Sequence, residues 1–265
     1  MSMTGIIIAA SIVGGVGILI GLFLGISGEN LKVEVNEKEV AVRACLPGNN
    51  CGGCGYAGCD GLAAAIVKGE AKVNGCPVGG ADVAAQIAEI MGVEIEETVR
   101  MAAFVKCSGT CDVAKEDYIY SGVEDCVMAS MVPNGGSKGC SYGCLGFGTC
   151  AKVCEFGGIS IVNGVAYIDR EKCQACGQCV NACPKHLIEM RPLNGVANVV
   201  CSSLDKGKSV MDVCSVGCIG CTLCEKQCPE GAIEMVNNLP VIDYNKCTGC
   251  GACESKCPKK IIHIT

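Results

Sequence analysis

The first segment of the chain is apolar without interruption. No charged residue occurs in residues 1–28, and residues 6–26 alone would form a helix of about 31 Å, long enough to cross a bilayer. The alternatives are a buried helix and a cleaved signal peptide, but the leading MSMTG lacks the basic side chain that usually begins a signal peptide. The pattern therefore predicts a single-pass transmembrane helix. Lys32, Lys38 and Arg43 follow it and favour the cytoplasmic side of the cell membrane for the rest of the chain.

Beyond this segment, short helix and strand patterns alternate. Helical periodicity over residues 60–68 ends at Gly69, and a second helix over 81–91 ends at Gly92, because glycine commonly caps a helix C-terminus. Further on, GISIVNGVAYIDREKC predicts two short strands around an Asn-Gly turn, and GAIEMVNNLPVIDYNKC occupies the equivalent place in a second copy. Together these patterns predict an α+β protein.

The composition points away from one large core and towards bound metal. The 265 residues contain no Trp and four Phe, but 26 Cys and 37 Gly. Cysteine at this density indicates either a disulfide scaffold or a metal or cluster protein in a reducing compartment, and the spacing must decide. The formal net charge of -6 and the lack of basic runs argue against nucleic acid as a partner.

A small helical module with four cysteines follows the apolar segment. Its spacing is C-x2-C-x4-C-x16-C, and three of the cysteines lie on a glycine-rich loop whose backbone amides can point at cluster sulfurs. The helix over residues 60–68 would bring the fourth cysteine back to this loop. The expected ligands of its [4Fe-4S] cluster are Cys51, Cys54, Cys59 and Cys76.

Three later segments match the bacterial ferredoxin motif C-x2-C-x2-C-x3-C-P without adjustment. Zinc is the alternative for C-x2-C pairs, but zinc sites join two distant pairs, whereas this continuous run is typical of [4Fe-4S] clusters. The three motifs are Cys173, Cys176, Cys179 and Cys183; Cys218, Cys221, Cys224 and Cys228; and Cys247, Cys250, Cys253 and Cys257.

An irregular run of four cysteines precedes them, spaced C-x3-C-x5-C-x3-C, with Glu155 in place of the proline. In ferredoxins with two clusters the fourth cysteine of a motif ligates the other cluster, so the motifs work in pairs. Eighteen residues separate Cys154 from Cys173 and also Cys228 from Cys247, which makes the irregular run the partner of the first regular motif. The expected ligand sets are Cys140, Cys144 and Cys150 with Cys183; Cys173, Cys176 and Cys179 with Cys154; Cys218, Cys221 and Cys224 with Cys257; and Cys247, Cys250 and Cys253 with Cys228.

Two questions about cysteines stay open at this point. A spare such as Cys126 could replace one member of the first set. In addition, four of the spare cysteines could bind a sixth cluster, or they could be free buried thiols, which behave as small apolar residues. The candidates for a sixth cluster are Cys107, Cys111, Cys126, Cys201 and Cys214, and Cys45 has no predicted role.

These motifs divide the chain into six expected parts. They are a transmembrane anchor (1–28), a four-cysteine iron-sulfur module (29–100), a cysteine-containing connector (101–137), a first ferredoxin-like domain (138–200), a linker (201–214) and a second ferredoxin-like domain (215–265).

A cluster held by four thiolates has no open coordination site, so the chain is expected to carry electrons and to have no catalytic residues. His186 and His263 are isolated in the sequence and predict no catalytic constellation. Lys256, Lys259 and Lys260 are either a docking site for an acidic partner or a solvated charged tail.

The apolar segment, the run CGGCGYAGC with Cys76, and the tandem ferredoxin motifs together resemble the B-subunit family (RnfB) of the Rnf complex. That complex is a membrane-bound ferredoxin:NAD oxidoreductase that couples electron flow to sodium or proton translocation. The resemblance implies that the chain takes electrons from reduced ferredoxin and passes them to membrane and peripheral subunits of the complex. It also implies that Cys51, Cys54, Cys59 and Cys76 hold the cluster nearest the membrane.

Two other functions fit parts of the sequence. The chain could be a polyferredoxin subunit of a membrane hydrogenase or of a carbon monoxide dehydrogenase system, or a zinc-binding scaffold without redox chemistry. The coupling ion, sodium or proton, is not readable from these motifs.

Overall fold

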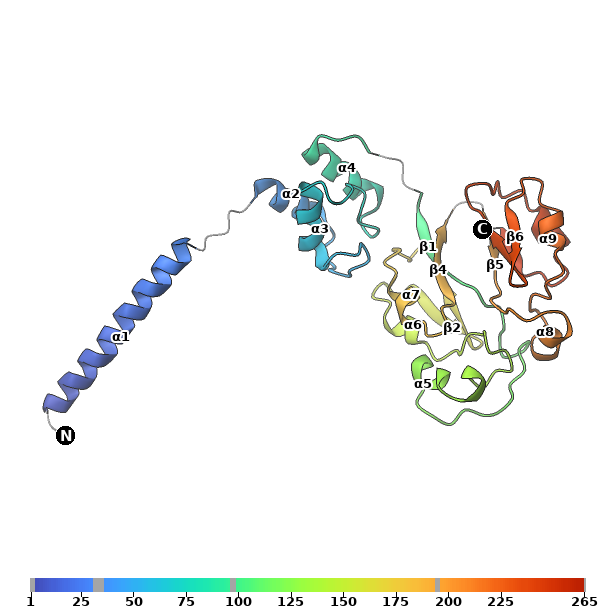
Figure 1. Cartoon of the computed structure of the whole chain (residues 1–265), viewed down its shortest axis with the longest axis horizontal. Coiled ribbons are helices and arrows are strands. Elements are labelled where there is room, and N and C mark those ends of the chain that lie inside the picture. The colour runs from blue at the N-terminus through green and yellow to red at the C-terminus, as the bar shows by residue number, and fades with distance from the viewer. Residues whose placement is uncertain (1–2, 31–35, 96–98, 194–195, 265) are drawn as a thin grey trace.

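The structure is a computed structural model, and it describes residues 3–30, 36–95, 99–193 and 196–264. A long N-terminal helix, α1 (Met3–Asn30), lies apart from the rest of the molecule (Figure 1). Three further helices form a small unit next to two compact units that carry the strands. These helices are α2 (Glu37–Cys45), α3 (Gly58–Val67) and α4 (Gly80–Met91).

The structure does not support the expected transmembrane helix. In the described part of the chain, no helix combines the length and the apolar character needed to cross a membrane. A span needs about 20 consecutive, mostly apolar residues.

The three-helix unit confirms the helices expected from the sequence. Helix α4 ends at Gly92, which has a left-handed φ of 69° and donates its N–H to the Ala88 carbonyl. Gly69, with φ of 78°, follows the end of α3 in the same way. Leu62 of α3 and Ile87 of α4 are buried in a common core, so each helix covers the apolar face of the other.

The first strand-bearing unit consists of two antiparallel strand pairs and short helices. Its outer pair joins the first strand to the last, with Ala103 opposite Met190. Its inner pair is a hairpin in which Asn163 and Gly164 both have positive φ, which confirms the expected turn. The elements are β1 (Met101–Val105), α5 (Cys126–Ser130), a 3-10 turn (Pro133–Gly135), α6 (Thr149–Lys152), β2 (Ile159–Val162), β3 (Val165–Ile168), α7 (Gln178–Ala182) and β4 (Ile188–Pro192).

The second unit repeats this arrangement. Its first and last strands pair, and a hairpin with positive φ at Asn237 and Asn238 lies between them. Helix α8 lies between the first strand and the first motif of this unit, as α5 and the 3-10 turn do in the first unit. The elements are β5 (Ala197–Val199), α8 (Lys208–Val213), α9 (Leu223–Lys226), β6 (Ile233–Val236), β7 (Leu239–Ile242), α10 (Ala252–Lys256) and β8 (Ile262–Ile264).

The outer strand pairs show that each unit begins earlier than its first ferredoxin motif. Strand β1 lies within the segment expected to be a connector, yet it pairs with β4 along its whole length. Strand β5 lies at the end of the segment assigned to the first domain, yet it pairs with β8 at the other end of the chain. Pairing of the first and last strand therefore closes each unit.

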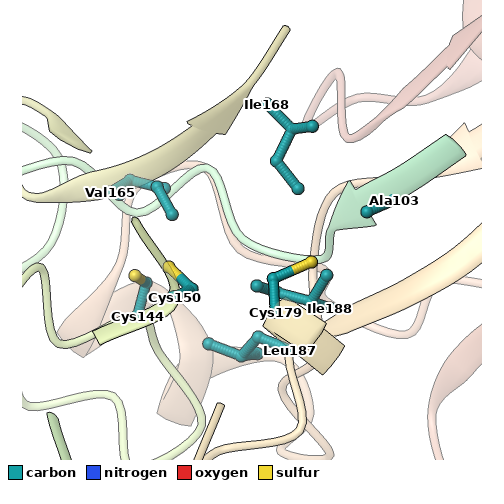
Figure 2. Packing of buried hydrophobic residues seen from close by; sticks show 9 residues of the cluster. Ala103, Cys144, Cys150, Val165, Ile168, Cys179, Leu187 and Ile188 are labelled. Atoms are coloured by element: carbon teal, nitrogen blue, oxygen red, sulfur yellow. The ribbon is translucent and has the colours of Figure 1, made fainter. Parts of the chain in front are cut away.

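Cysteines form a large share of both cores. In the first unit, Val165, Leu187 and Ile188 pack with Cys144, Cys150 and Cys179. Figure 2 shows Cys144 and Cys150 side by side, with Cys179 next to Leu187 and its sulfur turned towards Ala103. The equivalent core of the second unit contains Cys218, Cys224 and Cys253 with Ile233, Ile242, Ile261 and Ile262. Such small apolar cores leave much of the stability to whatever the cysteines bind.

Arg191 joins the two units. Its side chain is buried, donates from Nη1 to Asn198 Oδ1 at 3.1 Å, and is ion-paired with Glu189. The guanidinium also lies over the Phe104 ring at 4.5 Å and 5.8 Å from the Tyr244 ring centre. A strand of the first unit is thus held against residues of the second.

The hairpin turn of the first unit gives a stability test. Gly164 has φ of 74°, and a Cβ there would lie 2.5 Å from Cys111 Sγ, whereas Gly157 has φ of 59° and open space around it. We expect Gly157→Ala to lower the free energy of unfolding by about 1 kcal/mol, from backbone strain alone, and Gly164→Ala to lower it clearly more. Anaerobic denaturant unfolding followed by circular dichroism measures both. Equal losses would contradict the close packing of Cys111 against the turn.

Candidate iron-sulfur sites

Five cavities in the two strand-bearing units are each lined by four cysteines. Three of them contain the sets expected from the regular motifs, with the fourth cysteine arriving from the paired motif. These sets are Cys154, Cys173, Cys176 and Cys179; Cys218, Cys221, Cys224 and Cys257; and Cys228, Cys247, Cys250 and Cys253.

The irregular motif is placed differently from the expectation. The cavity that contains Cys144, Cys150 and Cys183 is completed by Cys126 and not by Cys140. Cys126 is the first residue of α5, and its backbone N–H donates to Thr149 Oγ1 at 2.8 Å, so it is fixed next to the start of α6. No spacing motif connects Cys126 to the run that follows it, which is why the sequence could only name it as a spare.

Cys140 lines the fifth cavity together with three cysteines that the sequence left unassigned. Those three are Cys107, Cys201 and Cys214. The remaining spare cysteines do not line any of these five cavities: Cys111 is exposed, and Cys45 packs against the core of the three-helix unit.

The three-helix unit brings three of its motif cysteines, Cys54, Cys59 and Cys76, close together. Burial raises the pKa of Cys76, the backbone N–H groups of Gly79 and Val78 lower it, and the nearby thiols of Cys59 and Cys54 raise it. Asn50 Oδ1 accepts the Cys59 N–H at 2.8 Å and so fixes the loop that carries Cys51 and Cys54 against the helix.

Backbone amides point at several of the sulfurs. The Ala103 N–H donates to Cys173 Sγ at 3.3 Å. The Leu187 N–H donates to Cys183 Sγ at 3.4 Å, and the Ala232 N–H donates to Cys228 Sγ at 3.3 Å. In both of these pairs the donor lies four residues after the cysteine. Such hydrogen bonds stabilise negative charge on sulfur and tune the reduction potential of a bound cluster.

Burial holds the pKa values of many of these thiols high. It raises the pKa of Cys150 to about 12, and the neighbouring thiols of Cys144, Cys126 and Cys183 add to the shift. In Cys140, Cys179, Cys218 and Cys224 burial raises the pKa to about 11. The thiolate form is therefore unfavourable in these cavities unless a bound cation or cluster compensates its charge.

The cavities fit a cluster better than a single ion. Within the described residues, no three His, Cys, Asp or Glu side chains converge closely enough to hold one metal ion. Four thiols around a cavity, with amides aimed at the sulfurs, are instead the donor set of a [4Fe-4S] cluster. The two histidines do not contribute: His263 is exposed beside Glu254, and neither His263 nor His186 lines any of the five cavities. Of the three C-terminal lysines, Lys259 donates to the Ser215 carbonyl at 2.8 Å.

The three-helix unit touches the first strand-bearing unit beside two of these cysteines. Gln178 Nε2 donates to the Cys51 carbonyl, and a Cβ on Gly53 would lie 2.5 Å from the Cys176 carbonyl oxygen. Cys51 is also among the thiols that raise the pKa of Cys176, after burial. The two four-cysteine sites are therefore neighbours.

Comparison with known families agrees with these sites. Residues 46–78 match a family model described as a putative Fe-S cluster, and residues 172–232 and 217–261 match one described as a 4Fe-4S dicluster domain. The first match contains the four motif cysteines of the three-helix unit, and the second contains the three regular motifs.

Similar proteins cover most of the chain. The B-subunit of the Na(+)-translocating ferredoxin:NAD(+) oxidoreductase complex of Acetobacterium woodii is 46% identical over 245 residues, which span 92% of this chain and 73% of that protein. The chain belongs to the RnfB family. The B-subunit of the ion-translocating oxidoreductase complex of Methanosarcina acetivorans is 43% identical over 89% of both chains. Its counterpart in the proton-translocating ferredoxin:NAD(+) oxidoreductase complex of Clostridium ljungdahlii is 42% identical over 86% of this chain and 81% of its own.

Membership of RnfB confirms the resemblance noted in the sequence. This chain is an iron-sulfur electron-transfer subunit of an oxidoreductase complex. The matching iron-sulfur family models and the four-cysteine cavities indicate that its cofactors are [4Fe-4S] clusters.

The contact at Gly53 gives a test of how the two units are joined. Gly53→Ala would place a methyl group against the Cys176 carbonyl, whereas Gly61→Ala, in the same module, would meet only Tyr56 Cβ at 3.7 Å. We expect Gly53→Ala to speed amide hydrogen exchange at residues 51–54 and 174–178 of the anaerobic protein by about tenfold, and Gly61→Ala to leave it unchanged. Unchanged exchange in Gly53→Ala would mean that the units are not held together there.

Proposed function

We propose that this RnfB chain takes electrons from reduced ferredoxin and delivers them to other subunits of an ion-translocating ferredoxin:NAD oxidoreductase. The observation that carries the proposal is the row of neighbouring four-cysteine sites, which runs from the three-helix unit into the strand-bearing units. When bound, a [4Fe-4S] cluster takes up and releases one electron without needing an open coordination position. A protein whose sites hold such clusters is suited to electron transfer.

Five ligand sets belong to this proposal. They are Cys51, Cys54, Cys59 and Cys76; Cys154, Cys173, Cys176 and Cys179; Cys126, Cys144, Cys150 and Cys183; Cys218, Cys221, Cys224 and Cys257; and Cys228, Cys247, Cys250 and Cys253. The protein contributes the thiolates, the amides that donate to their sulfurs, and apolar walls that keep water out. Cys126 enters the third set because it shares the cavity with Cys150, while Cys140 lies elsewhere.

We further propose that the cluster-bearing units face the cytoplasm. All 26 cysteines are unpaired thiols, and a reducing compartment keeps thiols in that state. Ion translocation takes place across a membrane, so the complex works at one, and the direct contacts of this chain are reduced ferredoxin and the neighbouring subunits. Relatives include a sodium-translocating and a proton-translocating complex, so the proposal names no single ion.

The first test removes the site of the three-helix unit. We expect Cys51→Ala to lose about four iron atoms per chain and to abolish ferredoxin-dependent NAD reduction by the assembled complex. The clusters of the strand-bearing units should remain visible by electron paramagnetic resonance, because their ligands lie in separate cores.

Cys45→Ala is the matched control, since Cys45 lies in the same unit and outside the motif. It should keep both iron and activity. Loss of every cluster signal in Cys51→Ala would contradict the separate units, and full activity with unchanged iron would contradict the proposed ligand set.

A second test concerns the irregular motif. Because Cys126 shares its cavity with Cys144, Cys150 and Cys183, Cys126→Ala should lower the iron content by about four atoms per chain. If Cys140 were the ligand there, as the motif alone suggests, Cys126→Ala would keep all its iron. Iron and acid-labile sulfide in anaerobically purified protein distinguish the two assignments.

A further inference from the structure

We propose that Cys107, Cys140, Cys201 and Cys214 bind a further [4Fe-4S] cluster between the two ferredoxin-like units. This inference rests on the proposed function, because it adds one site to the same row. The four residues line one cavity, and no regular ferredoxin motif contains any of them. The site would connect the clusters of the first unit to those of the second.

The four cysteines come from four separate segments that hydrogen bonds hold together. Ser108 Oγ donates to the Val200 carbonyl at 3.0 Å, which ties the segment of Cys107 to that of Cys201. Ser202 Oγ donates to the Tyr142 carbonyl at 3.0 Å, which ties the segment of Cys201 to that of Cys140.

The segment of Cys214 is fixed from both sides. The Lys115 N–H donates to the Val213 carbonyl at 2.8 Å, and the Ser215 N–H donates to the Val113 carbonyl at 2.9 Å. All four segments are therefore held around one cavity by contacts that do not involve the sulfurs.

The thiols themselves face one another. A Cβ added to Gly109 would lie 3.6 Å from Cys107 Sγ and 3.7 Å from Cys214 Sγ, so both sulfurs lie beside the same glycine. The remaining thiols of the group act on Cys140, whose pKa is raised first by burial and then by Cys107, Cys201 and Cys214.

Two hydrogen bonds connect this site directly to its neighbours on both sides. Cys107 Sγ accepts the backbone N–H of Cys144 at 3.4 Å, and Cys144 belongs to a site of the first unit. Cys201 Sγ accepts the backbone N–H of Cys218 at 3.3 Å, and Cys218 belongs to a site of the second unit. The site therefore lies between one cluster site of each unit.

A buried lysine in the lining of this cavity favours the binding of a negatively charged group there. Lys138 is 4% exposed and lines the cavity. Its Nζ donates to the carbonyls of Gly109 and Gly164 at 2.8 and 2.9 Å, and neither of these acceptors carries a charge. Among the described residues, no ion pair joins Lys138 to a carboxylate. A buried cation of this kind requires an anionic neighbour, and a thiolate-bound cluster is one.

The other spare cysteines are excluded by position. Cys111 is exposed and lies against the Asn163–Gly164 turn, and Cys126 lines the cavity of Cys150.

The proposed cluster would only relay electrons. When one electron passes from one flanking site to the other, the cluster returns to its starting oxidation state. It therefore needs no reactant beyond the reduced ferredoxin named above.

The experiment counts iron in the anaerobically purified full chain. Six clusters correspond to about 24 iron atoms and five to about 20. We expect about 24 in the wild type, about 20 in Cys201→Ala and in Cys214→Ala, and about 24 in the control Cys111→Ala. A wild-type value of about 20 overturns the sixth site even if both variants fail to fold. Unchanged iron in folded Cys201→Ala and Cys214→Ala overturns this ligand set.

Failure of the proposed function would give a different result. A colourless wild-type chain that holds zinc in place of iron would overturn the whole row of clusters and not this site alone. About 24 iron atoms in a complex that does not reduce NAD would leave the sixth site standing and overturn the proposed function.

The charge of Lys138 gives a second test, because it should affect the reduction potential of a nearby cluster. Because its positive charge favours the more negative, reduced state of a nearby cluster, Lys138→Met should shift one reduction potential of the chain to a lower value while the iron count stays near 24. Lys68→Met, which changes an exposed lysine that lines none of the five cavities, is the control. Unchanged potentials in Lys138→Met, with the iron count still near 24, would place the cluster away from Lys138 and overturn the site.

Discussion

Burying a thiolate away from water is unfavourable unless a bound metal and hydrogen bonds compensate its charge, and both ferredoxin-like units depend on that constraint. Their cores combine a few Val, Leu and Ile side chains with sulfurs that line cavities. The same sulfurs that would bind clusters thus occupy the places that larger apolar side chains fill in an ordinary domain. Folding and cluster binding are coupled for this reason.

The arrangement of the two units follows from this coupling. Each is closed by its first and last strand, β1 with β4 and β5 with β8, and each contains two four-cysteine cavities. The segments between the motifs are then also part of the cysteine cavities. The region from Cys107 to Cys126 and the region from Cys201 to Cys214 supply cysteines that line two of the cavities from outside the regular motifs.

The cysteine sites adjoin one another along the chain of units. Gln178 and Cys51 join the three-helix unit to the first strand-bearing unit, while Arg191 with Asn198 and Tyr244 joins the first unit to the second. These contacts fix how far apart neighbouring sites lie, and electron transfer depends on that separation. The packing between units is therefore as important to function as the sites themselves.

Local spacing in the sequence determined much of this protein. The four-cysteine motifs, the turn at Asn163–Gly164 and the cap at Gly92 depend on neighbours only a few residues away, so they could be predicted directly. The RnfB family was also recognisable from the motifs, whereas the spanning helix expected from the apolar N-terminal segment was wrong.

Only the tertiary structure decided where Cys126 and Cys140 lie. Their cavities are assembled from segments that are distant along the chain and are brought together by strand pairing and by side-chain hydrogen bonds such as Ser108 to Val200 and Ser202 to Tyr142. The spacing of cysteines in the sequence does not reveal which distant segments come together, because that depends on how whole units pack and not on the geometry of one loop.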